Sequence, residues 1–166
     1  PEALRKALEA AFEITEPRPV QEASYPLLAA GKNVVLQSRT GSGKTLAYLL
    51  PFLAKMTPGE SGNRLLVVAP TQELAVQIAN IIRALNAKLE GGYSIALCGG
   101  GANINHQIDK LKGRPAIIVG TPGRLLELFD RRKINGQTIE AVIFDEVDAI
   151  IAQEKGSLMK HIQKKL

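Results

Sequence analysis

The sequence has little cysteine and no long apolar run, and each absence excludes a class of protein. Cys98 is the single cysteine among 166 residues, which excludes an internal disulfide framework and a metal site built from several cysteines. No apolar run approaches the roughly 18 residues that a membrane-spanning helix needs, so we expect no membrane partner. Cys98 lies in the apolar stretch SIALC, where a free cysteine is expected to be a small buried core residue.

The composition is that of an ordinary globular protein. Hydrophobic residues make up 45% of the chain and charged residues 22%, and the length suits one domain over residues 1–166. The formal charge of +5 is a modest indication of a polyanionic partner. The chain begins at Pro1 without a signal-peptide pattern. We expect an intracellular location, with the cytoplasm preferred over the nucleus or an organelle.

Short apolar runs rich in β-branched residues alternate with longer stretches of helical period. This alternation predicts an α/β protein with a parallel sheet whose strands are buried on both faces. The expected strands are 34–37, 65–69, 94–98, 116–119 and 141–145. The expected helices are 44–56, 71–87, 104–112 and 122–131, with a further one at the N-terminus. In such proteins ligands bind at the carboxyl ends of the strands, so the residues after each strand are the place to look for a site.

A glycine-rich segment, SRTGSGKT, follows the first expected strand and opens a helix. Backbone N–H groups of such a turn can approach a phosphate closely, and the helix N-terminus adds partial positive charge. Lys44 supplies a charge for the outer phosphates and Thr45 a hydroxyl for Mg²⁺. The strict pattern has glycine where Ser38 stands, and the alternative is a flexible turn capped by threonine. The predicted nucleotide-binding loop comprises Ser38, Arg39, Thr40, Gly41, Ser42, Gly43, Lys44 and Thr45.

Carboxylates follow the last expected strand directly. Asp145 ends the run AVIFD, and Glu146 and Asp148 come just after it. Phosphate-bound Mg²⁺ in P-loop proteins takes a second anchor from an Asp at a strand end, which is the role predicted for Asp145. Glu146 is placed to orient or deprotonate an attacking water. A solvated helix start after a core strand is the alternative.

Further short motifs accompany these two in a fixed order. They are PRPVQ (17–21), PTQELA (70–75), Gly99–Gly100, TPGR (121–124) and DEVD (145–148). Together with the glycine-rich loop, this ordered set resembles the first RecA-like domain of a DEAD-box RNA helicase over nearly the whole chain. The resemblance implies a three-layer RecA-like P-loop NTPase domain with a mostly parallel central sheet, ATP and Mg²⁺ as cofactors, and RNA as a partner.

The resemblance also implies a role for each motif. Gln21 would read adenine through the donor and acceptor of its amide, with Phe12 stacking on the base. Lys44, Asp145 and Glu146 would carry the chemistry, and Thr45 and Asp145 would hold Mg²⁺, partly through water. Asp148 would couple to the family's Ser-Ala-Thr motif. Sequence-independent contacts to the RNA backbone would come from Pro70, Thr71, Gln72, Gly99, Gly100, Thr121, Pro122, Gly123 and Arg124.

Several positions depart from the family pattern. Arg18 stands where threonine is usual, and Phe12 is spaced more widely than usual from Pro17. Ser38 and Arg39 replace an Ala-Gln pair. Gln72 replaces an arginine, which removes a charge from the expected RNA track.

Three interpretations stay open at this stage. The first is part of an ATP-dependent RNA helicase that remodels RNA or a ribonucleoprotein complex. The Ser-Ala-Thr motif and the second RecA-like domain of such a protein are not among these residues, so we expect nucleotide binding without unwinding. The second is another P-loop motor, such as a DNA helicase or translocase. The third is a degenerate RNA-binding scaffold. For Gln21, a purely local capping role before EASYPLLAA is also open.

Overall fold

The computed structural model describes residues 1–152 and 156–166. The chain divides into two compact units, and each is considered by itself. The first unit comprises Pro1–Pro58 with Ala84–Gly92, and the second comprises Gly59–Arg83 with Tyr93–Leu166.

A sheet of four parallel strands forms the second unit. The strands are β1 (Leu65–Val68), β2 (Ile95–Cys98), β3 (Ile117–Gly120) and β4 (Ala141–Phe144). They lie in the order β2-β3-β1-β4, and every neighbouring pair is parallel. Parallel strands need a crossover connection, which explains why a helix separates each strand from the next along the chain.

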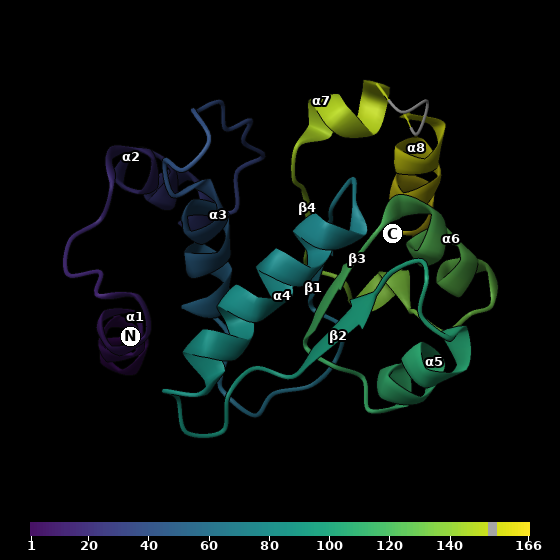
Figure 1. Ribbon diagram of the computed structural model, residues 1–166, viewed down its shortest axis with the longest axis horizontal. Coiled ribbons are helices and arrows are strands. Elements are labelled where there is room, and N and C mark those ends of the chain that lie inside the picture. Colours follow the sequence, from purple (N-terminus) through teal and green to yellow (C-terminus); the bar gives the residue numbers. More distant parts are fainter. Residues whose placement is uncertain (153–155) are drawn as a thin grey trace. The chain divides into compact units, whose positions relative to one another are not determined.

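The helices of the second unit cover both faces of this sheet. The connections contain α4 (Gln72–Asn86), α5 (Ile104–Lys112) and α6 (Pro122–Asp130), and α7 (Val147–Ile150) and α8 (Gly156–Lys165) follow β4. A short 3-10 helix, Gly136–Thr138, precedes β4. Figure 1 shows α4 on one side of the strands and α5, α6 and α8 on the other. The predicted α/β architecture with a parallel sheet is confirmed for this unit.

Alternate side chains of the strands point into a core between the sheet and α5, α6, α7 and α8. A strand turns successive side chains to opposite faces, so Leu66 and Val68 belong to this core while Leu65 and Val67 are buried on the other face. The members of the core are Leu66, Val68, Ala96, Cys98, Leu111, Ile118, Leu125, Leu128, Phe129, Ile134, Ile150 and Ile162. The expectation that Cys98 is buried is confirmed, and burial raises the pKa of its thiol to about 12.

The first unit contains α1 (Glu2–Phe12), α2 (Pro19–Ala29) and α3 (Lys44–Leu53). Proline begins α2, where its missing N–H costs nothing. Helices α2 and α3 pack together, and Leu49 and Leu53, one turn apart on α3, are fully buried. No helix in the described part of the chain is long and apolar enough to cross a membrane.

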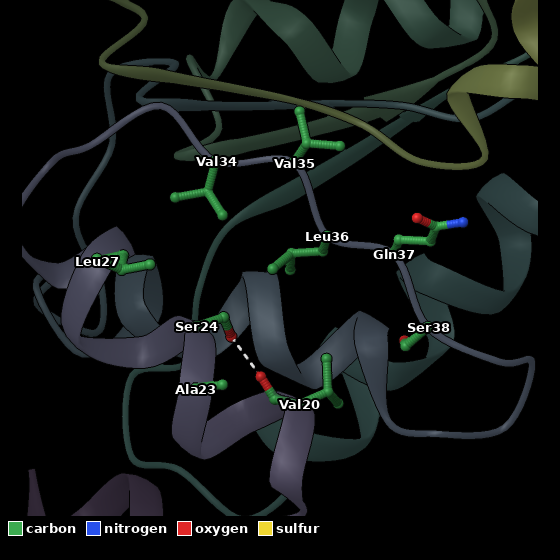
Figure 2. A pocket seen from close by; sticks show the side chains of 9 residues that line it. All are labelled: Val20, Ala23, Ser24, Leu27, Val34, Val35, Leu36, Gln37 and Ser38. Atoms are coloured by element: carbon green, nitrogen blue, oxygen red, sulfur yellow. Dashed lines mark hydrogen bonds between the residues drawn. The ribbon is translucent and has the colours of Figure 1, made fainter.

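One expected strand, residues 34–37, does not form. The segment is not a strand in the structure, although its burial alternates from one residue to the next. Val34 and Leu36 face α2, whereas Val35 points away and is 91% exposed (Figure 2). The apolar composition of residues 34–37 predicted that both faces of the segment are buried. In the structure only the face that carries Val34 and Leu36 is partly buried. Composition favours an extended backbone, but a strand also requires a neighbour for its N–H and C=O groups.

Two adjacent isoleucines after β4 test how much stability the core supplies. Ile150 is fully buried in the core, while Ile151 is 56% exposed. We expect Ile150→Ala to lower the free energy of unfolding by about 2–5 kcal/mol, because it removes buried methyl groups and leaves a cavity. Ile151→Ala should change it by less than about 0.5 kcal/mol. Urea unfolding of both variants measures the difference, and similar losses would contradict the assigned burial.

Candidate functional site

The glycine-rich loop of the first unit ends at the N-terminus of α3. Gly41 and Gly43 have φ values of +77° and +94°, in the left-handed region that glycine adopts without strain. Gly43 is the residue before the helix. The first N–H groups of a helix have no partner within it and carry partial positive charge, so this turn is suited to an anion.

Side chains from α2 and its approach hold the carbonyls of this loop. Arg18 Nη1 donates to the Gly41 carbonyl at 2.5 Å, and Gln21 Nε2 donates to the Gly43 carbonyl at 3.2 Å. The sequence flagged Arg18 only as a departure from the family pattern. The hydrogen bond shows that the arginine at this position connects the start of α2 to the loop, across 23 residues of sequence.

Lys44 and the two serines complete the hydrogen bonding of the loop. Lys44 Nζ donates to the Ser38 carbonyl at 2.7 Å, and the hydroxyls of Ser38 and Ser42 are 2.7 Å apart. Lys44 and Thr45 are half-buried, whereas Thr40 is exposed. The ammonium group of Lys44 is therefore held against its own loop by the Ser38 carbonyl.

Gln21 performs the capping role that the sequence left open as an alternative. Its Oε1 accepts a hydrogen bond from the Arg18 backbone N–H at 3.0 Å, and the residue is 6% exposed. The same amide reaches Gly43 with its other end. Capping and contact with the loop thus occur together, and adenine recognition stays a prediction. Phe12 ends α1 in a half-buried position, and its stacking role also stays a prediction.

The donors gathered at this loop fit a nucleotide polyphosphate. They comprise the N-terminal amides of α3, the ammonium group of Lys44 and the hydroxyl of Thr45. Within residues 1–152 and 156–166, no group of three or more His, Cys, Asp or Glu side chains could hold a metal ion. The roles of Thr45 and Asp145 as magnesium ligands stay a prediction.

In the second unit, the remaining motifs gather at one edge of the sheet. The strands end in register, with Val68 opposite both Gly120 and Phe144, and Cys98 opposite Gly120. The ladder continues one residue past three of these ends. The bonds join Ala69 N–H to Gly120 O, Thr121 N–H to Cys98 O and Asp145 N–H to Val68 O, at 2.9–3.0 Å. The predicted RNA-binding residues and the DEVD carboxylates therefore follow neighbouring strand ends.

The carboxylates after β4 differ in exposure. Asp145 is half-buried and its Oδ1 accepts the Glu146 backbone N–H at 2.9 Å. Glu146 has a φ of +46°, which is uncommon for a residue with a side chain and is found more often at functional sites. Glu146 and Asp148 are exposed. Asp145 is thus less exposed than the other two carboxylates, and the separate roles of the three stay predictions.

Gln72 is packed against the glycine turn after β2. Among the described residues its Oε1 is buried without a hydrogen-bond partner, and a Cβ added at Gly99 would lie 1.4 Å from it. A larger residue at position 99 would therefore displace the Gln72 side chain. Thr71 is exposed, and its hydroxyl accepts the Leu74 N–H at 3.2 Å. Direct RNA contact by Gln72 stays a prediction.

Sequence reasoning missed Gln107. It is a buried polar residue on α5 whose amide contacts both the glycine turn and Arg124. A signal existed in the sequence: Gln107 lies one turn from Ile104 and from Leu111, on the apolar side of the helix. A polar residue at a core-facing position needs a buried partner.

The parallel sheet with helices on both faces and motifs at its carboxyl edge defines a RecA-like α/β domain. Two solved structures share the fold of the chain. One is a hypothetical ATP-dependent RNA helicase from Sulfolobus tokodaii, with a TM-score of 0.87 and 34% identity, aligned over 99% of this chain and 46% of that one. The other is a DEAD box protein from Methanococcus jannaschii, with a TM-score of 0.90 and 31% identity over 99% and 44%.

Sequence comparison narrows the class. Residues 18–166 match the model of the DEAD/DEAH box helicase family, and the chain belongs to this family. The probable ATP-dependent RNA helicase YfmL of Bacillus subtilis is 40% identical over 90% of the chain. The DEAD-box ATP-dependent RNA helicase CshC of Bacillus cereus is 39% identical over 92%. The chain spans 39% and 38% of the lengths of these two relatives.

The hydrogen bond from Gln21 to the Gly43 carbonyl predicts that alanine substitutions at two glycines with left-handed φ destabilise the protein by different amounts. A Cβ at Gly43 would lie 2.7 Å from Gln21 Nε2, whereas one at Gly31, with a φ of +74°, would meet nothing within 4 Å. Both Gly→Ala changes should cost about 1–2 kcal/mol for the backbone conformation. Gly43→Ala should cost about 1 kcal/mol more, because the hydrogen bond from Gln21 is displaced. Denaturant unfolding of both variants checks this, and equal losses would contradict the contact.

Proposed function

We propose that the chain is the ATP-binding domain, and carries part of the RNA-binding surface, of an ATP-dependent RNA helicase. The family membership supports the class of activity. The observation that carries the proposal for this chain is the contact of Gln21 with the Gly43 carbonyl at the start of α3. This contact supports the proposal because Gln21, which we propose binds adenine, lies beside the loop that we propose binds the phosphates.

Different residues of the first unit would bind different parts of the nucleotide. The Gln21 amide offers N–H donors and a carbonyl acceptor, which match N7 and the exocyclic amine of adenine. Its Nε2 and Oε1 each bond to the protein's own backbone. Each atom has capacity for a second hydrogen bond, so adenine binding is compatible with these contacts. Lys44 likewise has further N–H donors beside the one bonded to the Ser38 carbonyl, and these would bind the outer phosphates.

Thr45 and Asp145 would hold Mg²⁺, which, when bound, neutralises charge that develops on the phosphates. Glu146 would accept a proton from the attacking water or orient it, since its carboxylate is exposed beside Asp145. Asp148, also exposed, would couple this site to the family's Ser-Ala-Thr motif. Arg39 and Ser42 would add to nucleotide binding at the rim of the loop.

RNA would bind across the carboxyl edge of the sheet. Thr71, the turn at Gly99–Gly100 and the segment 121–124 follow three adjacent strands. Hydroxyls and backbone N–H groups of this kind contact phosphate and sugar without reading sequence. We therefore propose sequence-independent binding, with the choice of RNA left to other parts of the whole protein.

The whole protein would contain a second RecA-like domain that completes the catalytic site and the RNA cleft. An arginine supplied in this way raises the rate by about 10³–10⁵-fold in comparable NTPases. The 166 residues alone should therefore bind nucleotide, hydrolyse it slowly and not unwind a duplex. We propose a cytoplasmic protein that acts on RNA within ribonucleoprotein complexes.

Two lysines near the two ends of the α3 segment test the nucleotide site. Lys44→Ala should weaken ATP binding by about 10–100-fold, because a charged hydrogen bond of about 1.5–3 kcal/mol to phosphate is lost. Lys55 is exposed beyond the end of α3, and Lys55→Ala should leave the affinity unchanged. Titration with a fluorescent ATP analogue measures both. Binding that Lys44→Ala leaves unaffected, or no binding by the unaltered chain, would argue for a degenerate scaffold.

The nature of the polynucleotide distinguishes an RNA helicase from a DNA motor. ATP hydrolysis by the whole protein should be stimulated by single-stranded RNA and much less by DNA of the same sequence and length. The rate of phosphate release at saturating ATP is the measurement. Equal stimulation by DNA, or stimulation by DNA alone, would contradict the assignment of RNA as the substrate.

A further inference from the structure

Gln107 connects two of the segments at the carboxyl edge of the sheet. The residue is 5% exposed on α5. Its Nε2 donates to the Gly99 carbonyl at 2.9 Å, and its Oε1 accepts from Arg124 Nη1 at 2.9 Å. Because a carbonyl can only accept and a guanidinium can only donate, the chemistry of the partners allows one orientation of this amide.

The guanidinium of Arg124 is held on two sides. Nη1 also donates to the Ala102 carbonyl at 3.2 Å, and Nε lies 3.2 Å from Glu127 Oε2. The side chain is 15% exposed. Within the described ranges no hydrogen bond is recorded for Nη2. The guanidinium thus has a fixed plane and one nitrogen left for another acceptor.

The glycine turn is fixed by the same network. The carbonyls of Gly99 and Ala102, at its two ends, accept hydrogen bonds from Gln107 and Arg124 respectively. The amide of Gln107 serves both neighbours, whereas a carboxylate would have no donor for the carbonyl and an ammonium no acceptor for the guanidinium. An apolar side chain would leave the Gly99 carbonyl and part of a charged group buried without partners.

We propose that Gln107 is a positioning residue for RNA binding: it holds Arg124 and the glycine turn 99–101 in the arrangement that contacts the RNA backbone. The inference rests on the proposed RNA-binding function. Gln107 itself would touch no RNA. Its effect would pass through Arg124, whose Nη2 would bind a phosphate. Held guanidinium groups lose little conformational freedom on binding, which favours their use at a phosphate site.

The number of phosphate contacts provides a measurement that a structural role alone would not change. For single strands, the logarithm of the binding constant falls with the logarithm of the salt concentration with a slope of about 0.7 for each phosphate contact. Arg124→Met should reduce this slope by about 0.7. Gln107→Met removes no charge, yet it should reduce the slope by a similar amount because Arg124 is no longer held. The double variant should show no further reduction.

The binding constants are measured on the full chain with a fluorescent single-stranded uridine oligomer, with a non-hydrolysable ATP analogue present. Gln77 is an exposed glutamine on α4, and Gln77→Met provides the matched control with an unchanged slope. Thermal unfolding and ATP affinity are measured alongside. If Gln107→Met fails to fold, Gln107→Asn is the second variant. Its amide adds no charge but is one methylene shorter, so it should not bond to both the Gly99 carbonyl and Arg124, and the slope should fall as for Gln107→Met.

The outcomes separate this inference from the function on which it rests. If the unaltered chain and the whole protein bind no RNA, both are overturned. If RNA binds and Arg124→Met lowers the slope while the folded Gln107 variants keep the unaltered value, only the role of Gln107 is overturned. A reduced affinity with an unchanged slope overturns it as well, because that result indicates a structural effect alone.

Discussion

The parallel hydrogen-bond ladder is the constraint on which the second unit depends. Its bonds extend past the last residues of β1, β3 and β4, so the segments that leave these strands begin at the same level. Parallel strands also keep their carboxyl ends at one edge. Motifs that are up to 75 residues apart, such as those at Pro70 and Asp145, are thereby brought to one edge by backbone pairing.

The glycine turns at both candidate sites are held by the same kind of contact. In each turn, polar side chains donate hydrogen bonds to backbone carbonyls. In the first unit Arg18 and Gln21 are the donors, and in the second Gln107 and Arg124 are. Unpaired backbone groups are costly when buried. The polar side chains therefore hold the loops in shape while leaving backbone N–H groups at the start of α3 for a ligand.

Three of the four side chains that hold the turns are charged or contact a charged group. Arg18 and Arg124 are charged, and Gln107 contacts Arg124. Arg124 is held between an amide, a carbonyl and a carboxylate, so its charge stays at one place on the edge of the sheet. A localised charge of this kind is suited to a regularly spaced polyanion such as an RNA backbone. The family membership and the placement of this arginine thus support the same proposed partner.

The sequence by itself determined the local features. Periodicity placed α4, α5 and α6 within a residue or two of their observed bounds, and the β-branched runs placed the four strands of the sheet. The order of the motifs indicated the family. Only the tertiary structure decided that residues 34–37 form no strand, that Gln72 packs on Gly99, and that Gln107 joins the turn to Arg124. The physical reason is that helix and strand preference is encoded over a few neighbouring residues, whereas the partner of a strand edge or of a buried amide comes from distant parts of the chain.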